Sequence, residues 1–123
     1  MHKASIMTFL AVALGGALGA VCRYGLSLLL MGATWPQATL LANCLGCFFI
    51  GLIAVPLAGP DLSAARALLV VGFLGAFTTY SSLALETWRL AESQPSVAFA
   101  YAFGTLILAL AACFAGLIVG RLL

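Results

Sequence analysis

Charged residues are scarce in this chain. Of its 123 residues, only 7% are charged and 65% are hydrophobic, whereas charged residues make up about 25% of an ordinary soluble domain. So few charges cannot cover a surface that faces water. The composition therefore predicts an integral membrane protein embedded in lipid. The net charge of +2, without any basic run, gives no indication of nucleic-acid binding.

The chain also lacks the alternation of apolar and polar residues that marks the strands of a transmembrane barrel. Instead, four apolar stretches fill it, each near the length of about 20 residues that a helix needs to cross the bilayer core. We therefore predict an all-α fold, a single domain of four transmembrane helices. The predicted spans are residues 4–30, 37–57, 64–89 and 97–119.

Groups typical of enzymes are missing from these spans. The chain has one histidine, His2. No nucleophile lies near a base, and no phosphate-binding loop or acid pair falls where a membrane pocket can form. We therefore expect a protein that is not an enzyme.

Two ionisable residues, Arg23 and Glu86, fall inside predicted spans. Such residues are costly in lipid and usually face a partner or a water-filled cavity. Arg23 is near enough to the end of its span to reach the interface, so anchoring and attraction of an anion fit equally well. For Glu86 the simpler interpretation is an interfacial carboxylate paired with Arg89 or water.

Asn43 places an amide at membrane depth, one helical turn after Thr39 and on the same face. An amide in lipid needs partners. Its side chain can hold two helices together, or it can donate an N–H to a permeating anion. The residue pattern leaves both roles open.

The third span contains five consecutive hydroxyl-bearing residues, Thr78 to Ser82, preceded by Gly72 and Gly75. Each glycine lowers helix stability by about 1 kcal/mol relative to alanine, and broken helices at membrane depth often line ion sites. We predict a helix break near residues 75–79. Freed carbonyls there suit a small cation, whereas hydroxyl and amide donors suit an anion.

Small residues recur four positions apart, which lets helix backbones approach one another closely. We interpret these positions as helix-packing faces. The sets are Gly15 with Gly19, Gly16 with Ala20, Ala42 with Gly46, and Ala112 with Gly116 and Gly120.

The bias of positive charge between the two sides of the membrane is weak. Lys3, Arg66 and Arg121 would lie on the side of the termini and Arg89 on the other, with Arg23 too deep to assign, so the ratio is three to one or three to two. Because so weak a bias permits insertion in either orientation, we consider an antiparallel dimer of identical subunits as a hypothesis.

Three stretches resemble the small bacterial fluoride channel family, the camphor-resistance-like membrane proteins. They are GGALGAVCRY at 15–24, TLLANCLGCF at 39–48 and GFLGAFTTYS at 72–81. The three motifs occur in the family's order, each in its expected span.

The resemblance implies a passive, fluoride-selective channel that exports fluoride across the bacterial inner membrane and lowers its toxicity. It implies a dual-topology antiparallel homodimer with two pores, and a central Na⁺ held by the backbone carbonyls of Gly75 and Thr78. Arg23 would lie near an aqueous vestibule. The fluoride pathway would be formed by Thr39, Asn43, Tyr80, Ser81, Ser82, Leu83, Tyr101 and Thr105.

One motif departs from the family pattern. The family typically has Phe-Ser-Thr-Phe, whose positive ring edges coordinate fluoride, whereas this chain has Tyr80, Ser81, Ser82 and Leu83. Tyr80 keeps a ring edge, but Leu83 has none. Three explanations of the missing second ring are open, in this order of preference. The chain is a variant channel that uses Tyr80 alone, it is a subunit that needs a different partner chain, or it is a homologue with altered ion preference.

Two other function classes are compatible with four short spans. A small multidrug-type proton-coupled exporter needs a carboxylate deep in its first helix, but the only charge between Ala4 and Leu30 is Arg23. The second class is a non-conducting assembly subunit, in which Asn43 and the hydroxyl groups only hold helices together.

Overall fold

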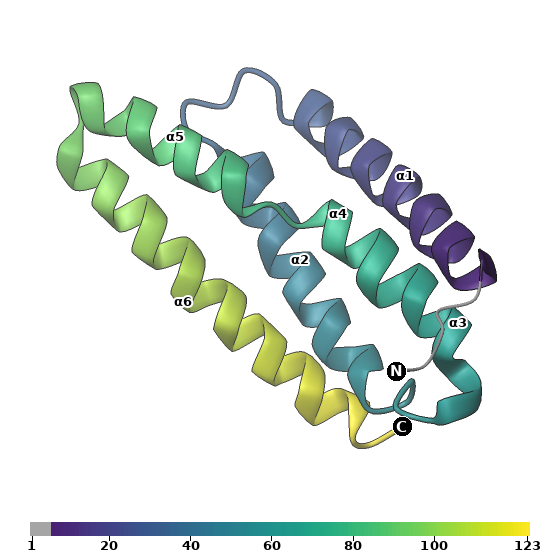
Figure 1. Cartoon of the computed structure of the whole chain (residues 1–123). Coiled ribbons are helices and arrows are strands. Elements are labelled where there is room, and N and C mark those ends of the chain that lie inside the picture. The colour runs from purple at the N-terminus through teal and green to yellow at the C-terminus, as the bar shows by residue number, and fades with distance from the viewer. Residues whose placement is uncertain (1–5) are drawn as a thin grey trace.

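The computed structural model describes residues 6–123. His2, Lys3 and the first two residues of the first predicted span, Ala4 and Ser5, lie outside this range. Three hydrophobic regions form uninterrupted helices: α1 (Ile6–Leu29), α2 (Gln37–Ala54) and α6 (Pro95–Gly120). The remaining region consists of shorter pieces: η1 (Pro60–Leu62), α3 (Ser63–Arg66), the π-helix η2 (Ala67–Leu74), α4 (Gly75–Phe77) and α5 (Tyr80–Ser93) (Figure 1).

Four regions of residues 6–123 are long and apolar enough to cross a membrane, and no strand occurs among these residues. The predicted all-α fold with four spans is therefore confirmed. Large apolar side chains cover the outside of the molecule; Phe9, for example, is 67% exposed and Ile107 is 64% exposed. A surface of this kind is suited to lipid, which is as apolar as these side chains.

The third region is longer than the predicted 64–89, because it extends from Pro60 to Ser93. Pro60 begins the first turn, where the fixed φ of proline suits a helix start. At the other end, the N–H of Gln94 donates to the carbonyl of Leu90 at 2.7 Å, which closes the last turn of α5. The helix thus continues beyond its apolar part.

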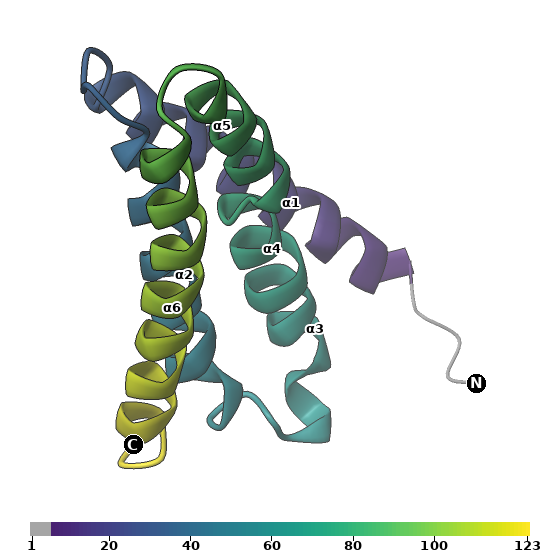
Figure 2. The same cartoon turned by 90° about the vertical axis from the view of Figure 1, so that its left-hand side faces the viewer.

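The broken helix passes from one neighbour to another. Its first half, η2 and α4, packs against α1, whereas its second half, α5, packs against α6 (Figure 1). Helices α2 and α6 lie side by side along their length, and α1 lies at an angle to the broken helix in the second view (Figure 2). The break is therefore where the chain crosses between these two groups of helices.

Glycines set the helix contacts. A Cβ atom on Gly116 would overlap the Phe48 carbonyl oxygen of α2, and one on Gly120 would overlap that of Leu52. On the other side of the molecule, Gly15 and Gly19 leave no room for a Cβ against the backbone of η2. The predicted packing role holds at these positions. Gly16, in contrast, faces open space.

The π-helix η2 was not predicted. Its residues, Ala67 to Leu74, are apolar apart from their backbone and carry no pattern that distinguishes a π-helix from an α-helix. A π-helix winds more residues into each turn and is frequent at functional sites. Here it leads directly into α4 and the break.

We predict that Gly116→Ala destabilises the protein by about 1–3 kcal/mol, the usual cost of overpacking, because the new methyl group meets the Phe48 carbonyl. Gly104→Ala in the same helix is the control, since nothing lies within 4 Å of its Cβ position and alanine favours a helix by roughly 1 kcal/mol. Thermal unfolding in detergent measures both; equal stability of the two variants would contradict tight α2–α6 packing.

Candidate functional site

The break in the third helical region lies at Thr78 and Thr79, inside the predicted range of 75–79. Both residues have extended backbone, with φ −78° and ψ 155° at Thr78 and φ −151° and ψ 118° at Thr79. The Thr79 hydroxyl oxygen accepts a hydrogen bond from the backbone N–H of Ser82 at 3.1 Å. Thr79 is thus the N-cap of α5, a position that favours threonine and serine.

Asn43 of α2 binds the broken backbone with both ends of its amide. Its Nδ2 donates to the Thr79 carbonyl at 3.0 Å, and its Oδ1 accepts from the Thr79 N–H at 2.7 Å. The Asn43 side chain is buried, with 8% of its surface exposed. The amide therefore makes the interhelical contact that was one of its two predicted roles. Because an amide nitrogen has two hydrogens, its role as an anion donor stays a prediction.

Arg23 of α1 also binds the backbone beside the break. Its Nε donates to the Ala76 carbonyl of α4 at 3.1 Å. The side chain is half-buried, so α1 and α4 are joined at the C-terminal end of a helical segment, where partial negative charge favours a cation. The structure thus shows a bond to α4, and both the anchoring role and the vestibule role stay predictions.

A second polar cluster joins α2, α5 and α6 around Glu86. Thr39 Oγ1 donates to Glu86 Oε1 at 2.9 Å, and Tyr101 Oη donates to Glu86 Oε2 at 2.7 Å. Thr39 and Tyr101 are buried. In the structure, hydroxyl groups on neighbouring helices donate to both carboxylate oxygens, and within residues 6–123 no ion pair of Glu86 with Arg89 is formed; capping by water stays a prediction.

The two clusters are adjacent along their helices. Thr39 precedes Asn43 by four residues on α2, and Ser82 precedes Glu86 by four on α5, so each pair lies on one helix face. We call the set Thr39, Asn43, Ser82, Glu86, Tyr101 and Thr105 the polar stripe. Glu86 was not among the predicted pathway residues. Its spacing of four from Ser82 is the signal that would have found it.

Thr105 ends the polar stripe on α6, one turn after Tyr101. Its side chain is 3% exposed, and its hydroxyl oxygen has no hydrogen-bond partner within residues 6–123. A buried hydroxyl without a partner costs about 1–3 kcal/mol. Thr105 therefore has an unused donor and acceptor inside the helix bundle.

The sequence of the chain matches a known protein family. Residues 10–117 match the family described as CrcB-like protein, Camphor Resistance (CrcB). The chain belongs to this family.

Curated relatives carry the name fluoride-specific ion channel FluC. The relative from Paracoccus denitrificans (strain Pd 1222) is 45% identical over 117 residues, 93% of this chain and 94% of the relative. A relative from Thermus thermophilus is 48% identical, over 88% of this chain and 90% of the relative. The relative from Stutzerimonas stutzeri (strain A1501) is 46% identical, over 91% and 95%. The match to these CrcB-family members thus covers nearly the whole length on both sides.

Three predicted pathway residues of this CrcB-family chain, Tyr80, Ser81 and Leu83, lie outside the polar stripe. Tyr80 is 82% exposed, and with Leu83 it lines a groove of about 470 Å³ between α5 and α6. Ser81 is exposed but its hydroxyl lies 3.3 Å from that of Thr79. Helix α5 therefore has two faces: Ser82 and Glu86 on the inner one, Tyr80 and Leu83 on the outer one.

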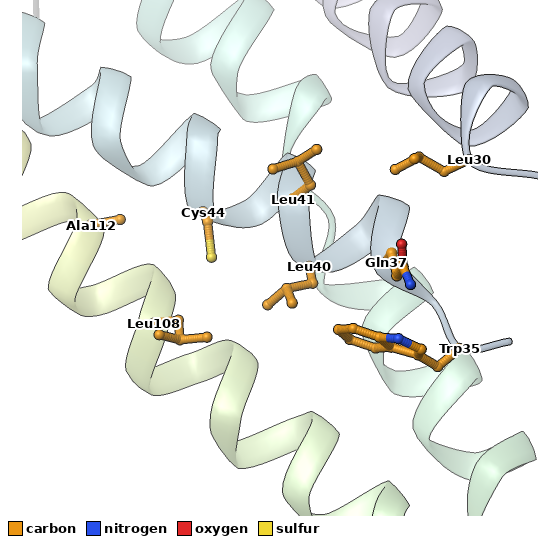
Figure 3. Close-up of a pocket in the computed structure, with 8 residues that line it drawn as sticks. All are labelled: Leu30, Trp35, Gln37, Leu40, Leu41, Cys44, Leu108 and Ala112. Atoms are coloured by element: carbon orange, nitrogen blue, oxygen red, sulfur yellow. The ribbon is translucent and has the colours of Figure 1, made fainter. Parts of the chain in front are cut away.

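Another groove, of about 540 Å³, lies between α2 and α6 and is almost entirely apolar (Figure 3). Its lining residues are Leu30, Trp35, Gln37, Leu40, Leu41, Cys44, Leu108 and Ala112. Gln37 and Trp35 lie together at one end of the groove in Figure 3. The Trp35 ring packs edge-on against Tyr101, with centroids 6.5 Å apart. The groove offers an ion few ligands, but its end supports the ring whose hydroxyl binds Glu86.

We predict that Tyr101→Phe destabilises the fold by about 1.5–3 kcal/mol, the usual contribution of a hydrogen bond to a charged group, because Glu86 loses one of its two donors. Tyr24→Phe is the control, since the Tyr24 side chain is 63% exposed on α1. Unfolding in denaturing detergent compares the two. Equal midpoints would show that the Glu86 cluster contributes nothing to stability.

Proposed function

We propose that this chain forms a fluoride-selective channel in the bacterial inner membrane, through which cytoplasmic fluoride leaves passively. The relatives named fluoride-specific ion channels support this function, since they match about nine-tenths of both chains. The structural observation that carries the proposal is the polar stripe, which joins three helices inside a molecule whose outer surface is apolar. Fluoride that enters a cell as neutral HF dissociates inside, and a passive pore returns the ion down its electrochemical gradient.

Fluoride is small and strongly hydrated, so a pore must offer several donors in place of water. The polar stripe offers the second N–H of Asn43 and the hydroxyl of Ser82. Beyond them lies the Thr105 hydroxyl, which has no hydrogen-bond partner among residues 6–123. Thr39 and Tyr101 hydroxyls, now directed at Glu86, can turn toward a passing anion. By turning from Glu86 to the anion, these hydroxyls would keep the ion supplied with hydrogen-bond donors along the pathway.

The proposed assembly is an antiparallel homodimer in the lipid bilayer. The weak bias of positive charge between the two sides supports insertion in both orientations. The face beside the break supports a partner: Gly75 is exposed, and Tyr80 exposes 82% of its surface. A second copy on this face would cover the outer side of α5 and complete a pathway that one chain leaves open.

The proposed central cofactor is Na⁺, held by the carbonyls of Gly75 and Thr78. In a continuous helix these carbonyls accept from the N–H groups four residues later. Here those two N–H groups, of Thr79 and Ser82, donate instead to side-chain oxygens of Asn43 and Thr79. Both carbonyls are thereby free of their helical donors. Backbone oxygens at a broken membrane helix are ligands that suit Na⁺.

A second candidate function is favoured by one observation. Leu83 stands beside Tyr80 in the outer groove where the family typically has a second aromatic ring. The chain would then conduct only together with a different partner chain that supplies this ring. Both candidates place Tyr80 in the fluoride pathway.

Efflux from liposomes tests the main proposal. We expect purified protein alone to release fluoride rapidly and to retain chloride under matched gradients, because closely spaced donors favour the smaller anion. Liposomes without protein give the baseline rate of leakage. Correctly folded protein that releases neither ion would contradict a self-sufficient channel and favour the two-chain assembly.

We predict that Leu83→Phe raises fluoride efflux about fivefold, which corresponds to about 1 kcal/mol of barrier, because a second ring edge then faces the pathway beside Tyr80. Ala84→Phe is the control: it adds the same ring one residue away in the same groove. Rates from a fluoride electrode compare the variants. An equal increase in both would assign the effect to added bulk rather than to the position of the ring.

A further inference from the structure

Asn43 takes the place of the Gly75 carbonyl as the hydrogen-bond acceptor for the Thr79 N–H. We propose that Asn43 is a positioning residue for the cation site: by accepting the Thr79 N–H, it keeps the Gly75 carbonyl available to a cation. This inference rests on the Na⁺ site of the proposed function. It assigns to Asn43 a task that is separate from donating to fluoride.

The geometry around Thr79 shows what the amide does. One side chain engages both backbone groups of that residue, at 2.7 and 3.0 Å. Thr79 is itself buried, with 9% of its surface exposed. Without the amide, the buried N–H of Thr79 would lose its partner, which is unfavourable. Water is absent from the bilayer core, so the backbone must find a partner within the protein.

The partner that a continuous α-helix would give the Thr79 N–H is the Gly75 carbonyl. Residues 75–77 are already helical, and the carbonyl of Gly75 is the one that accepts from position 79 in a continuous α-helix. If ψ of Thr78 turned from 155° to the helical value near −42°, the helix would extend by one residue. The Gly75 oxygen would then be occupied and lost to a cation.

Helix α2 is built to hold this arrangement. Gly46, three residues after Asn43, leaves no room for a Cβ because the Thr78 methyl group occupies that space. The Thr78 hydroxyl donates to the Leu74 carbonyl at 2.9 Å, so it does not compete for the Gly75 oxygen. Two successive contacts from one helix, Asn43 and Gly46, therefore fix the break on both of its residues.

A loss of ion flux in an Asn43 variant has two separable causes. The variant has either lost an anion donor or lost the shape of the break. Flux alone does not distinguish these causes. Sodium-dependent stability does, because it reports the carbonyl site and not the fluoride donor.

The experiment measures the thermal unfolding midpoint of the purified full-length protein in Na⁺ and in N-methylglucamine at equal ionic strength. Asn43→Asp keeps an oxygen that accepts the Thr79 N–H in either protonation state. Asn43→Leu has a similar shape and no acceptor. Leu45→Ala, a side chain 39% exposed on the same helix, is the control for changes in α2.

We expect sodium to raise the midpoint of the wild type, because a ligand that binds only the folded state stabilises it. Leu45→Ala and Asn43→Asp should keep at least half of this shift. Asn43→Leu should lose nearly all of it while keeping its helical circular dichroism.

Three results would overturn the inference, and each has a different meaning. A full sodium shift in folded Asn43→Leu would show that the carbonyl site does not need the amide, with the Na⁺ proposal intact. No sodium shift in the wild type and in Leu45→Ala would reject the Na⁺ site itself. If Asn43→Leu fails to fold, Asn43→Asp still decides: loss of its sodium shift, with the acceptor retained, contradicts the inference.

Discussion

The structure depends on one constraint: a helix is broken at membrane depth, where no water can satisfy its backbone. Side chains supply the hydrogen bonds that the broken backbone needs. Asn43 serves both backbone groups of Thr79, the Thr79 hydroxyl serves the N–H of Ser82, and Arg23 serves the carbonyl of Ala76. These three residues come from three different helical segments or their junctions. The break is therefore a tertiary structure in itself, and it holds only while α1 and α2 stay in place.

The glycine contacts bring those side chains within reach. On α1, Gly19 packs directly against the Phe73 carbonyl, and Arg23 follows one turn later. On α2, Asn43 precedes Gly46, which packs against Thr78. A short side chain such as asparagine can span two helices only when their backbones lie close together. The polar contacts at the break thus depend on the close packing of the helices.

Much of the fold follows from simple features of the sequence. Hydrophobic length gave the number of spans, and glycines followed by hydroxyl residues located the break. The π-helix η2 (Ala67–Leu74) had no such signal, because it differs from an α-helix only in backbone pairing. The partners of Glu86 were also beyond sequence reasoning: Arg89 is close in sequence, yet the carboxylate binds Thr39 and Tyr101 on other helices. Only the tertiary packing decides between such partners.

The arrangement of α5 limits how the predicted pathway residues can act together. Ser82 and Glu86 face the inside of the bundle, whereas Tyr80 and Leu83 line the outer groove. Within a single chain Tyr80 lies nearly opposite Ser82 on α5, so these two residues cannot contact one ion together. Leu83 and Glu86, in contrast, are three residues apart and are neighbours on the helix surface. Under the proposed dimer, the outer face of one copy would meet the other copy.

A ring on the outer face would then act on an ion that also contacts residues of the partner. Under the proposed dimer, Leu83 would lie at a shared surface, where the second chain would help to determine the ligands. Tyr80 exposes 82% of its surface in the single chain. Contact with lipid alone would leave its polar hydroxyl without a hydrogen-bond partner. A tyrosine at this position is explained if another chain, or an ion held between two chains, supplies the partner of its hydroxyl or ring edge.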